Sequence, residues 1–139
     1  MTADENKRIV RALYEQVFQR HRLDLVDEFI ADDYVQHNPA LPAGKKGFVE
    51  FHTVFFRAIP DAFAAINEML AEGDYVWVYN TITGTHTGAG FLDRPPTGNA
   101  ISYDVVDMFR LKDGKLVDHW DVADTRALFT QVGAVQAAP

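Results

Sequence analysis

Residues 100–123 have the sequence AISYDVVDMFRLKDGKLVDHWDVA, in which two alternating runs of apolar and polar residues flank Asp113-Gly114. Alternation with a period of two indicates β-strands, and an Asp-Gly pair between such runs is a strong signal for a tight hairpin. We therefore expect strands over 100–111 and 115–123 that pair antiparallel across this turn.

Two further alternating runs precede the hairpin, over 62–71 and 74–86, with the turn signal Glu72-Gly73-Asp74 between them. Consecutive strands joined by turns predict a sheet that is mainly antiparallel and connected in sequence order. A short last helix is expected over 124–132.

Before residue 60 the apolar residues recur at helical spacing instead. We expect one helix over 2–20, opened by Thr2 and Glu5 at the spacing of a capping box, a short one over 23–30, and a third over 47–59 that ends at Pro60. Residues 34–47 hold two prolines and two glycines and are expected to form an extended loop. Helices followed by strands predict an α+β domain in which three N-terminal helices bury their apolar stripes against one face of the sheet.

The composition limits the class of protein. At 139 residues, 47% of them hydrophobic and 24% charged, the chain fits one domain over 1–139 with its own core. The absence of cysteine excludes disulfides, thiolate zinc sites and a cysteine nucleophile. The net charge of −7 and the scattered Lys and Arg argue against nucleic acid as a partner. With no signal-type segment and no apolar run of about 18 residues, we expect a cytoplasmic protein with no membrane partner.

The strand over 74–86 has two apolar faces of different character. Val76, Val78 and Ile82 lie on one face, and Tyr75, Trp77 and Tyr79 lie on the other. If the aliphatic face meets the helices, the aromatic face needs another cover, because large uncovered apolar patches are unusual on monomers. We therefore expect a homodimer formed through this outer face.

Polar residues interrupt the apolar faces of the hairpin. Asp107 shares a strand face with large apolar side chains, and His119 and Asp121 share a face of the last strand. Centring the hairpin on Asp113-Gly114 places Asp107 and Asp121 about equally far from the turn, so the two carboxylates can approach across the ladder. Two carboxylates in a dry pocket repel, which raises one pKa and gives an acid–base pair suited to proton transfer. Alternatively, the aspartates point outward or bond only backbone amides.

Two more groups of polar residues are candidates for binding a ligand. Gln36-His37-Asn38-Pro39 follows the first two helices, where His37 and Asn38 could point into the mouth of a cavity, although such a segment is also ordinary turn chemistry. Asn80 and His86 lie on the aliphatic side of their strand, where the amide could orient a carbonyl or could simply be a satisfied core residue.

The apolar wall of such a pocket is expected to come from Phe51, Phe55 and Tyr103, with Trp120 also contacting the ligand. His52, within the same Phe-rich helix, is interpreted as a partly exposed helix residue. The histidines have no spacing typical of a metal site, so no metal is expected.

Five short motifs resemble those of the SnoaL-like polyketide cyclase family, which lies within the nuclear transport factor 2-like superfamily. These are Tyr34-Val-Gln-His-Asn-Pro39, Gly84-Thr-His-Thr-Gly88, Pro95-Pro-Thr-Gly98, Asp113-Gly-Lys115 and His119-Trp-Asp-Val122. The resemblance extends over roughly 30–133 and implies a cone, in which helices close a strongly curved sheet around a pocket, and commonly a dimer.

The resemblance also implies a chemistry. In these cyclases an aspartate of the final strand is the general acid–base of an intramolecular aldol closure, and the matching residue here is Asp121. The cyclases use a histidine one strand earlier, where this sequence has Asp107. The resulting acidic pair also resembles the epoxide hydrolases of the superfamily, but no arginine clearly completes their Asp-Arg-Asp arrangement.

The working hypothesis is an enzyme in which Asp121 abstracts a proton next to a carbonyl and Asp107 or His119 supports or returns it. His37 and Asn80 would hold the oxygen, no metal or organic cofactor would be required, and the ligand would be a small hydrophobic carbonyl compound. The alternatives are a binding protein that captures a hydrophobic ligand without turnover, and a dimerisation module whose pocket is filled by the Phe stripe.

Overall fold

The computed structural model describes residues 1–134, and its helices and strands lie close to the ranges expected from the sequence. The helices are α1 (Ala3–Leu13), α2 (Val26–Phe29), α3 (Gly44–Ala58) and α4 (Thr125–Gln131). The strands are β1 (Ile30–Gln36), β2 (Phe63–Glu72), β3 (Tyr75–Thr85), β4 (Ala100–Lys112) and β5 (Lys115–Ala123). The expected domain also includes 135–139, which lie outside the described residues.

The first helix is longer than α1 alone. Thr2 and Glu5 form the expected capping box, with Glu5 N donating to Thr2 Oγ1 at 3.1 Å and Thr2 N donating to Glu5 Oε2 at 2.7 Å. After Leu13 the chain continues as a π-helical segment, Tyr14–Gln19, so the single helix expected over 2–20 changes its winding at Tyr14. No helix within residues 1–134 is long and apolar enough to cross a membrane.

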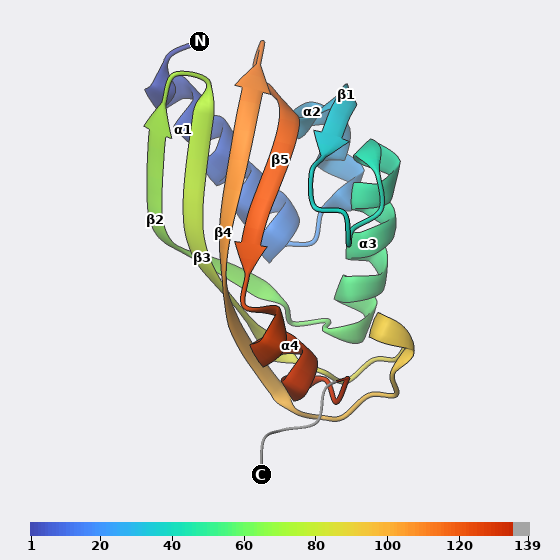
Figure 1. The fold of residues 1–139 in the computed structure, drawn as a ribbon. Helices are drawn as coiled ribbons and strands as arrows, with labels where there is room; N and C mark the ends of the chain where they lie inside the picture. The colour runs from blue at the N-terminus through green and yellow to red at the C-terminus, as the bar shows by residue number, and fades with distance from the viewer. Residues whose placement is uncertain (135–139) are drawn as a thin grey trace.

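The five strands form one curled, open sheet with the order β1-β5-β4-β3-β2. The expected sequential antiparallel pairing of β2 to β5 is confirmed, and β1 pairs parallel to β5 at one edge. Helix α1 packs against β2 and β3, α3 against β1, and α4 against β4 near the lower end of the sheet (Figure 1). The helices thus lie on the concave side, and the expected α+β fold with a strongly curved sheet is confirmed.

The hairpin of β4 and β5 has the geometry that its sequence predicts. Asp113 and Gly114 both have positive φ, 51° and 80°, as a two-residue type I′ turn requires. This turn pairs Lys112 with Lys115 and, after one irregularity at Arg110/Leu111, sets Asp107 directly opposite Asp121. The turn brings the two carboxylates near each other, and the one-residue register shift at this irregularity sets them directly opposite.

The prediction of an extended loop over 34–47 is partly wrong. Residues 30–36 form β1, and α3 already begins at Gly44. β1 joins the sheet through long-range parallel pairing to β5, interrupted by a register shift between Ile30 and Val35. An irregular edge strand of this kind leaves little alternation in the sequence, which explains why the pattern does not reveal it.

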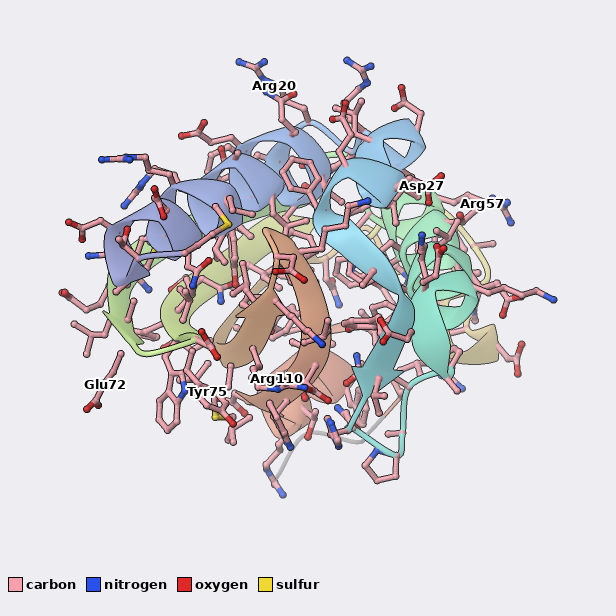
Figure 2. All side chains as sticks on the ribbon, turned by 90° about the horizontal axis from the view of Figure 1, so that it is seen from above. Arg20, Asp27, Arg57, Glu72, Tyr75 and Arg110 are labelled. Carbon is pink, nitrogen blue, oxygen red and sulfur yellow. The ribbon has the colours of Figure 1, made fainter. Side chains whose placement is uncertain are left out.

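The two faces of the sheet differ as the sequence predicts. Val76 and Val78 are fully buried beneath the helices, whereas Tyr75, Trp77 and Tyr79 are 43%, 52% and 43% exposed on the outer face. Figure 2, a view from above, shows the sheet curving beneath α1, with Tyr75 and Arg110 at its outer side and Arg20, Arg57 and Glu72 pointing outward. The concave face therefore holds the core, and an aromatic strip remains on the convex face.

Two glycines let the end of β3 approach the end of α3. A Cβ added to Gly84 would lie 2.4 Å from Ile59 Cγ2, and one added to Gly88 would lie 2.1 Å from the carbonyl oxygen of Arg57. Gly88 N donates instead to the carbonyl of Ala58 at 2.9 Å. The glycines of the Gly84–Gly88 motif are thus required for packing at one end of the cavity described below.

Candidate active site

A cavity of about 210 Å³ lies between the concave face of the sheet and α3. Most of its wall is apolar, and half of the apolar lining residues are aromatic: Phe18, Phe48, Phe51, Phe55, Phe56, Phe91, Tyr103, Phe109 and Phe129. Its polar side chains are Gln36, Asn38, His52, Asn80, Asp107, His119, Asp121 and Thr125. No lysine or arginine of residues 1–134 is among the lining residues. An apolar chamber with acidic and imidazole groups on one wall favours binding of an uncharged organic ligand.

Asp107 is held by three hydrogen-bond donors. Its Oδ1 accepts from His119 Nε2 at 2.8 Å, and its Oδ2 accepts from Asn80 Nδ2 at 3.0 Å and from the Tyr14 hydroxyl. Burial alone would raise the pKa of this carboxyl, but the donors and the charge of a protonated His119 outweigh burial, so its pKa lies below the usual value. Asp107 is therefore a largely buried anion whose two oxygens both accept hydrogen bonds.

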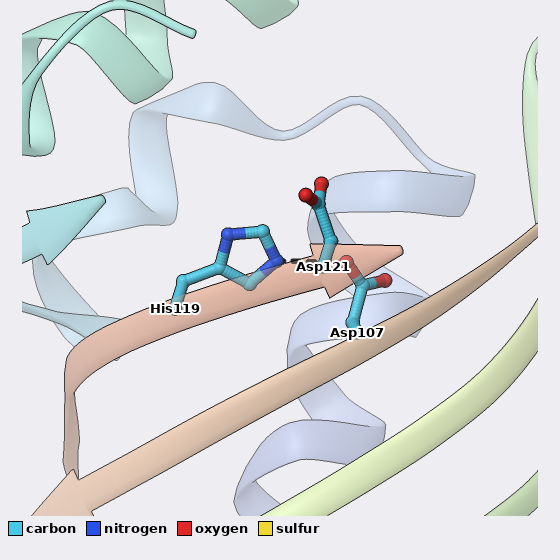
Figure 3. A group of neighbouring side chains, drawn as sticks. All are labelled: Asp107, His119 and Asp121. Atoms are coloured by element: carbon cyan, nitrogen blue, oxygen red, sulfur yellow. Dashed lines mark hydrogen bonds and ion pairs between the residues drawn. The ribbon is translucent and has the colours of Figure 1, made fainter. Parts of the chain in front are cut away.

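The pKa of Asp121 is shifted in the opposite direction to that of Asp107. Burial and the negative charge of Asp107 raise its pKa, although His119 and a hydrogen bond from Asn38 act in the other direction. Asn38 Nδ2 donates to Asp121 Oδ1 at 2.8 Å, and Oδ2 accepts no hydrogen bond from the described residues. In Figure 3 the Asp121 carboxyl projects away from the ladder, while His119 and Asp107 bond each other. Asp121 thus has a raised pKa and one oxygen available to a ligand.

His119 links the carboxylates to β1. Its Nε2 lies 2.8 Å from Asp107 Oδ1, which can only accept, so Nε2 carries a proton. The other ring nitrogen of His119, Nδ1, faces the side-chain amide of Gln36. It lies 2.9 Å from Gln36 Nε2 and 3.0 Å from Gln36 Oε1. Because a carboxamide offers both a donor and an acceptor, Gln36 can serve His119 in either its neutral or its protonated form.

Three residues expected to bind the ligand lie outside the cavity lining. His37 and Trp120 stack at 4.3 Å between ring centroids, and His37 Nε2 bonds Asp118 Oδ1 at 2.8 Å. Asp118 Oδ2 in turn accepts from Arg110 Nε at 2.6 Å. The physical reason is the alternation of β5: His119 and Asp121 face inward, so their neighbours Asp118 and Trp120 face outward and draw His37 with them.

His86, the third residue outside the lining, joins two loops. Its Nδ1 accepts from Thr97 N at 3.3 Å and lies 2.9 Å from Thr97 Oγ1. Its Nε2 is buried without a partner among the described residues, and burial lowers the pKa of the ring. His86 therefore ties the Gly84–Gly88 motif to the Pro95–Gly98 motif.

Eight of the expected residues do line the cavity: Asn38, Phe51, Phe55, Asn80, Tyr103, Asp107, His119 and Asp121. The sequence reasoning missed Tyr14, named Gln36 only as part of the segment Gln36–Pro39, and gave His52 no role. Tyr14 was counted only as an apolar helix residue, and the one clue to its role is a hydroxyl at a position that is fully buried. His52 is half-buried, which agrees with its interpretation as a partly exposed helix residue, but it also lines the cavity.

Asp107, His119 and Asp121 each offer one metal-ligating atom within 4.8 Å of the others. The hydrogen bonds argue against a cation at this point, because the Tyr14 hydroxyl, Asn80 Nδ2 and His119 Nε2 all direct protons at Asp107. A metal bound by Asp107 and His119 would have to displace their mutual hydrogen bond. The arrangement suits proton transfer better than metal binding.

The fold and this cavity define the class of protein: a small α+β domain of the nuclear transport factor 2-like kind, with a cavity inside its curved sheet. Solved structures of other proteins have the same fold. AclR from Streptomyces galilaeus superposes with a TM-score of 0.88 at 28% sequence identity, covering 99% of this chain and 87% of AclR. IdmH from Streptomyces antibioticus gives 0.76 at 28% identity, covering 92% and 98%.

Sequence comparison narrows the class. The family model of the SnoaL-like polyketide cyclases matches residues 8–132. The chain is 33% identical over 123 residues to nogalonic acid methyl ester cyclase of Streptomyces nogalater, covering 84% of this chain and 89% of that protein. It is 29% identical over 138 residues to aklanonic acid methyl ester cyclase DauD of Streptomyces sp. (strain C5), covering 94% and 83%. The chain belongs to the SnoaL-like polyketide cyclase family.

Proposed function

We propose that this protein is a cyclase that uses general acid–base chemistry in its apolar cavity, closing a ring by an aldol-type reaction or a related proton transfer next to a carbonyl. The observation that carries the proposal is the state of Asp121, whose pKa is raised and whose Oδ2 accepts no hydrogen bond from residues 1–134 at the cavity wall. A carboxylate whose pKa is shifted toward neutrality is a better base than an ordinary surface aspartate.

The proposed reaction needs only the groups of the chain. Asp121 Oδ2 takes a proton from the carbon next to a substrate carbonyl and leaves an enolate. The enolate carbon attacks a second carbonyl of the same substrate, forming the carbon–carbon bond while that carbonyl becomes an alkoxide. The alkoxide then takes the proton from Asp121, so the carboxylate is restored and no net proton is gained or lost.

Asn38 takes the place first expected for His37 in holding the substrate oxygen. One N–H of Asn38 Nδ2 donates to Asp121 Oδ1, and the second N–H is bonded to no described residue. This amide lies beside the base and lines the cavity. It can therefore donate to the oxygen on which the enolate charge develops.

His119 and Asp107 act as a pair in this proposal. The cyclases that the sequence resembles use a histidine one strand before the aspartate, where this chain has Asp107. Here His119 supplies an imidazole from the last strand, bonded to Asp107 at 2.8 Å. The charge of Asp107 would help to hold the pKa of Asp121 above its usual value, and His119, which acts on that pKa in the other direction, would balance charge when the enolate forms.

The epoxide hydrolase alternative has less support. That arrangement requires an arginine between two aspartates, and among the described residues the cavity lining contains none. The names of the curated relatives also refer to cyclases.

The test is proton exchange on a simple ketone, 1-tetralone, whose α-hydrogens can be followed by NMR in D2O. We expect the wild-type protein to accelerate exchange at the α-carbon and Asp121→Asn to reduce the accelerated rate by about 100-fold or more. Asp33→Asn, at an exposed strand position, serves as the matched control and should keep the full rate. A folded Asp121→Asn protein with undiminished exchange would refute the assignment.

The same measurement separates catalysis from binding alone. A protein that binds 1-tetralone, seen as saturable changes in its NMR spectrum, but does not accelerate exchange would be a binding protein without turnover. In that case the apolar wall would explain the affinity and Asp121 would only orient the ligand.

A further inference from the structure

His52 is the one polar side chain in the aromatic wall that α3 contributes to the cavity. Its ring lies 4.2 Å from that of Phe48 and 5.1 Å from that of Phe51, measured between centroids, with Phe18 and Phe56 at 5.4 Å and 5.5 Å. A polar ring surrounded by four phenylalanines has few groups that can satisfy it, so its hydrogen bonds define what it can do.

One nitrogen of His52 is already used, and this fixes the other. Nδ1 lies 2.8 Å from the carbonyl oxygen of Phe48, one turn earlier in α3. A carbonyl can only accept, so Nδ1 carries the proton and Nε2 of the neutral ring presents a lone pair. Burial lowers the pKa of His52 to about 4, so the ring is neutral at physiological pH.

The lone pair of Nε2 has no partner within residues 1–134, yet it is not sealed. Among the described residues, two buried side-chain atoms are unpaired and closed to a water-sized molecule: Asn80 Oδ1 and His86 Nε2. His52 Nε2 is not among them, so a water-sized molecule can reach it. His52 lines the cavity. A water molecule or a ligand in the cavity can therefore donate a hydrogen bond to this nitrogen.

We infer that His52 Nε2 accepts a hydrogen bond from a hydroxyl group of the substrate, so that the protein selects ring-bearing carbonyl compounds that also carry a phenol or enol hydroxyl. The inference rests on the proposed function for the carbonyl and adds the hydroxyl. A neutral imidazole lone pair selects a donor over an acceptor: a methoxy group or a bare ring cannot satisfy it.

The position of His52 explains why this contact would determine orientation. The carboxylates lie on strands β4 and β5, whereas His52 lies on helix α3, which packs against β1. The charges of His119 and Asp107 both act on the pKa of His52, although neither residue is hydrogen-bonded to His52 within residues 1–134. A substrate held at both places would present one defined carbon to Asp121.

The test compares the dissociation constants of two ligands, 6-hydroxy-1-tetralone and 1-tetralone, by isothermal titration calorimetry. One hydrogen bond is expected to make the wild-type protein bind the hydroxylated ketone about three- to tenfold more tightly. His52→Phe, which fits the surrounding phenylalanines, should lose this preference while binding 1-tetralone at least as well. His52→Gln, which retains an acceptor, should keep part of the preference.

The outcomes are distinguishable from those for the proposed function. Asp121→Asn should keep the preference for the hydroxylated ketone, because His52 and not Asp121 creates it. Equal affinities in the wild type, an unchanged preference in His52→Phe, or no binding of either ketone at millimolar concentration would each overturn the inference. Circular dichroism of both His52 variants checks that they fold.

Discussion

Asp107 and Asp121 lie directly opposite each other in the β4–β5 ladder, yet their pKa values are displaced in opposite directions. The difference comes from their donors. Asp107 receives hydrogen bonds from Tyr14, Asn80 and His119, whereas Asp121 receives one from Asn38. The better-satisfied carboxylate remains charged, and its charge makes ionisation of its neighbour harder. Two aspartates in one cavity thereby acquire different roles.

Asp107→Asn is expected to destabilise the fold. An amide would present two protons to a site where three donors already converge, so we expect a loss of about 1–3 kcal/mol in urea denaturation at pH 7. Because the pKa of Asp107 is lowered in the fold, its contribution is complete above the unfolded-state pKa of about 3.9 and is lost as the pH falls through the lower folded value. The difference between the proteins should therefore shrink in acid. Asp33→Asn, exposed on β1, should show neither effect.

Asn38→Ala is expected to move the pH dependence of exchange on 1-tetralone. The base is the charged form of Asp121, so the rate should rise with pH through the pKa of that carboxyl. Asn38 Nδ2 stabilises the charged form, and its removal should raise the pKa further and shift the rising limb to higher pH. A limb that stays in place, measured from pH 3 to pH 8, would show that Asn38 does not act on the base.

The sequence predicts the sheet better than the site. The Asp113-Gly114 turn brings Asp107 and Asp121 near each other from local information, whereas the one-residue register shift at Arg110/Leu111, which sets them directly opposite, is not visible in the sequence. The alternation along β3 likewise predicts which face is buried. Both inferences hold because a period of two and a two-residue turn are properties of neighbouring residues.

The contacts of the site depend on residues far apart in the chain. Tyr14 meets Asp107 across 93 positions, and Gln36 meets His119 across 83. The outward position of His37 depends on the pairing of β1 with β5, which aligns Gln36 with His119. Local pattern holds no information on such pairings, so it finds the residues that carry chemistry without showing which of them meet.

The homodimer expected through the outer face stays a prediction. Tyr75, Trp77 and Tyr79 remain 43–52% exposed on the convex side of β3. Native mass spectrometry of the wild-type protein should give twice the chain mass of 15.6 kDa. Trp77→Arg should give the single-chain mass, because a charge at the centre of an apolar interface is costly. Lys7→Arg, which leaves the charge and the sheet unchanged, is the control, and a wild-type mass of one chain at all concentrations would contradict the dimer.

His52 is expected to make the stability of the fold depend on pH. Its pKa is about 4 in the fold against an ordinary value of 6.5, so between these values the unfolded chain binds a proton that the folded one does not. The free energy of unfolding should therefore fall as the pH is lowered from about 6.5 to about 4, by at most on the order of 3 kcal/mol. In His52→Phe that part of the slope should disappear, while the slope from the other titrating groups remains. The measurement is urea denaturation of both proteins at half-unit pH steps, taking the difference at each pH. A constant difference across this window would mean that His52 takes up its proton at the same pH in the folded and the unfolded chain, and would contradict the lowered pKa of its ring.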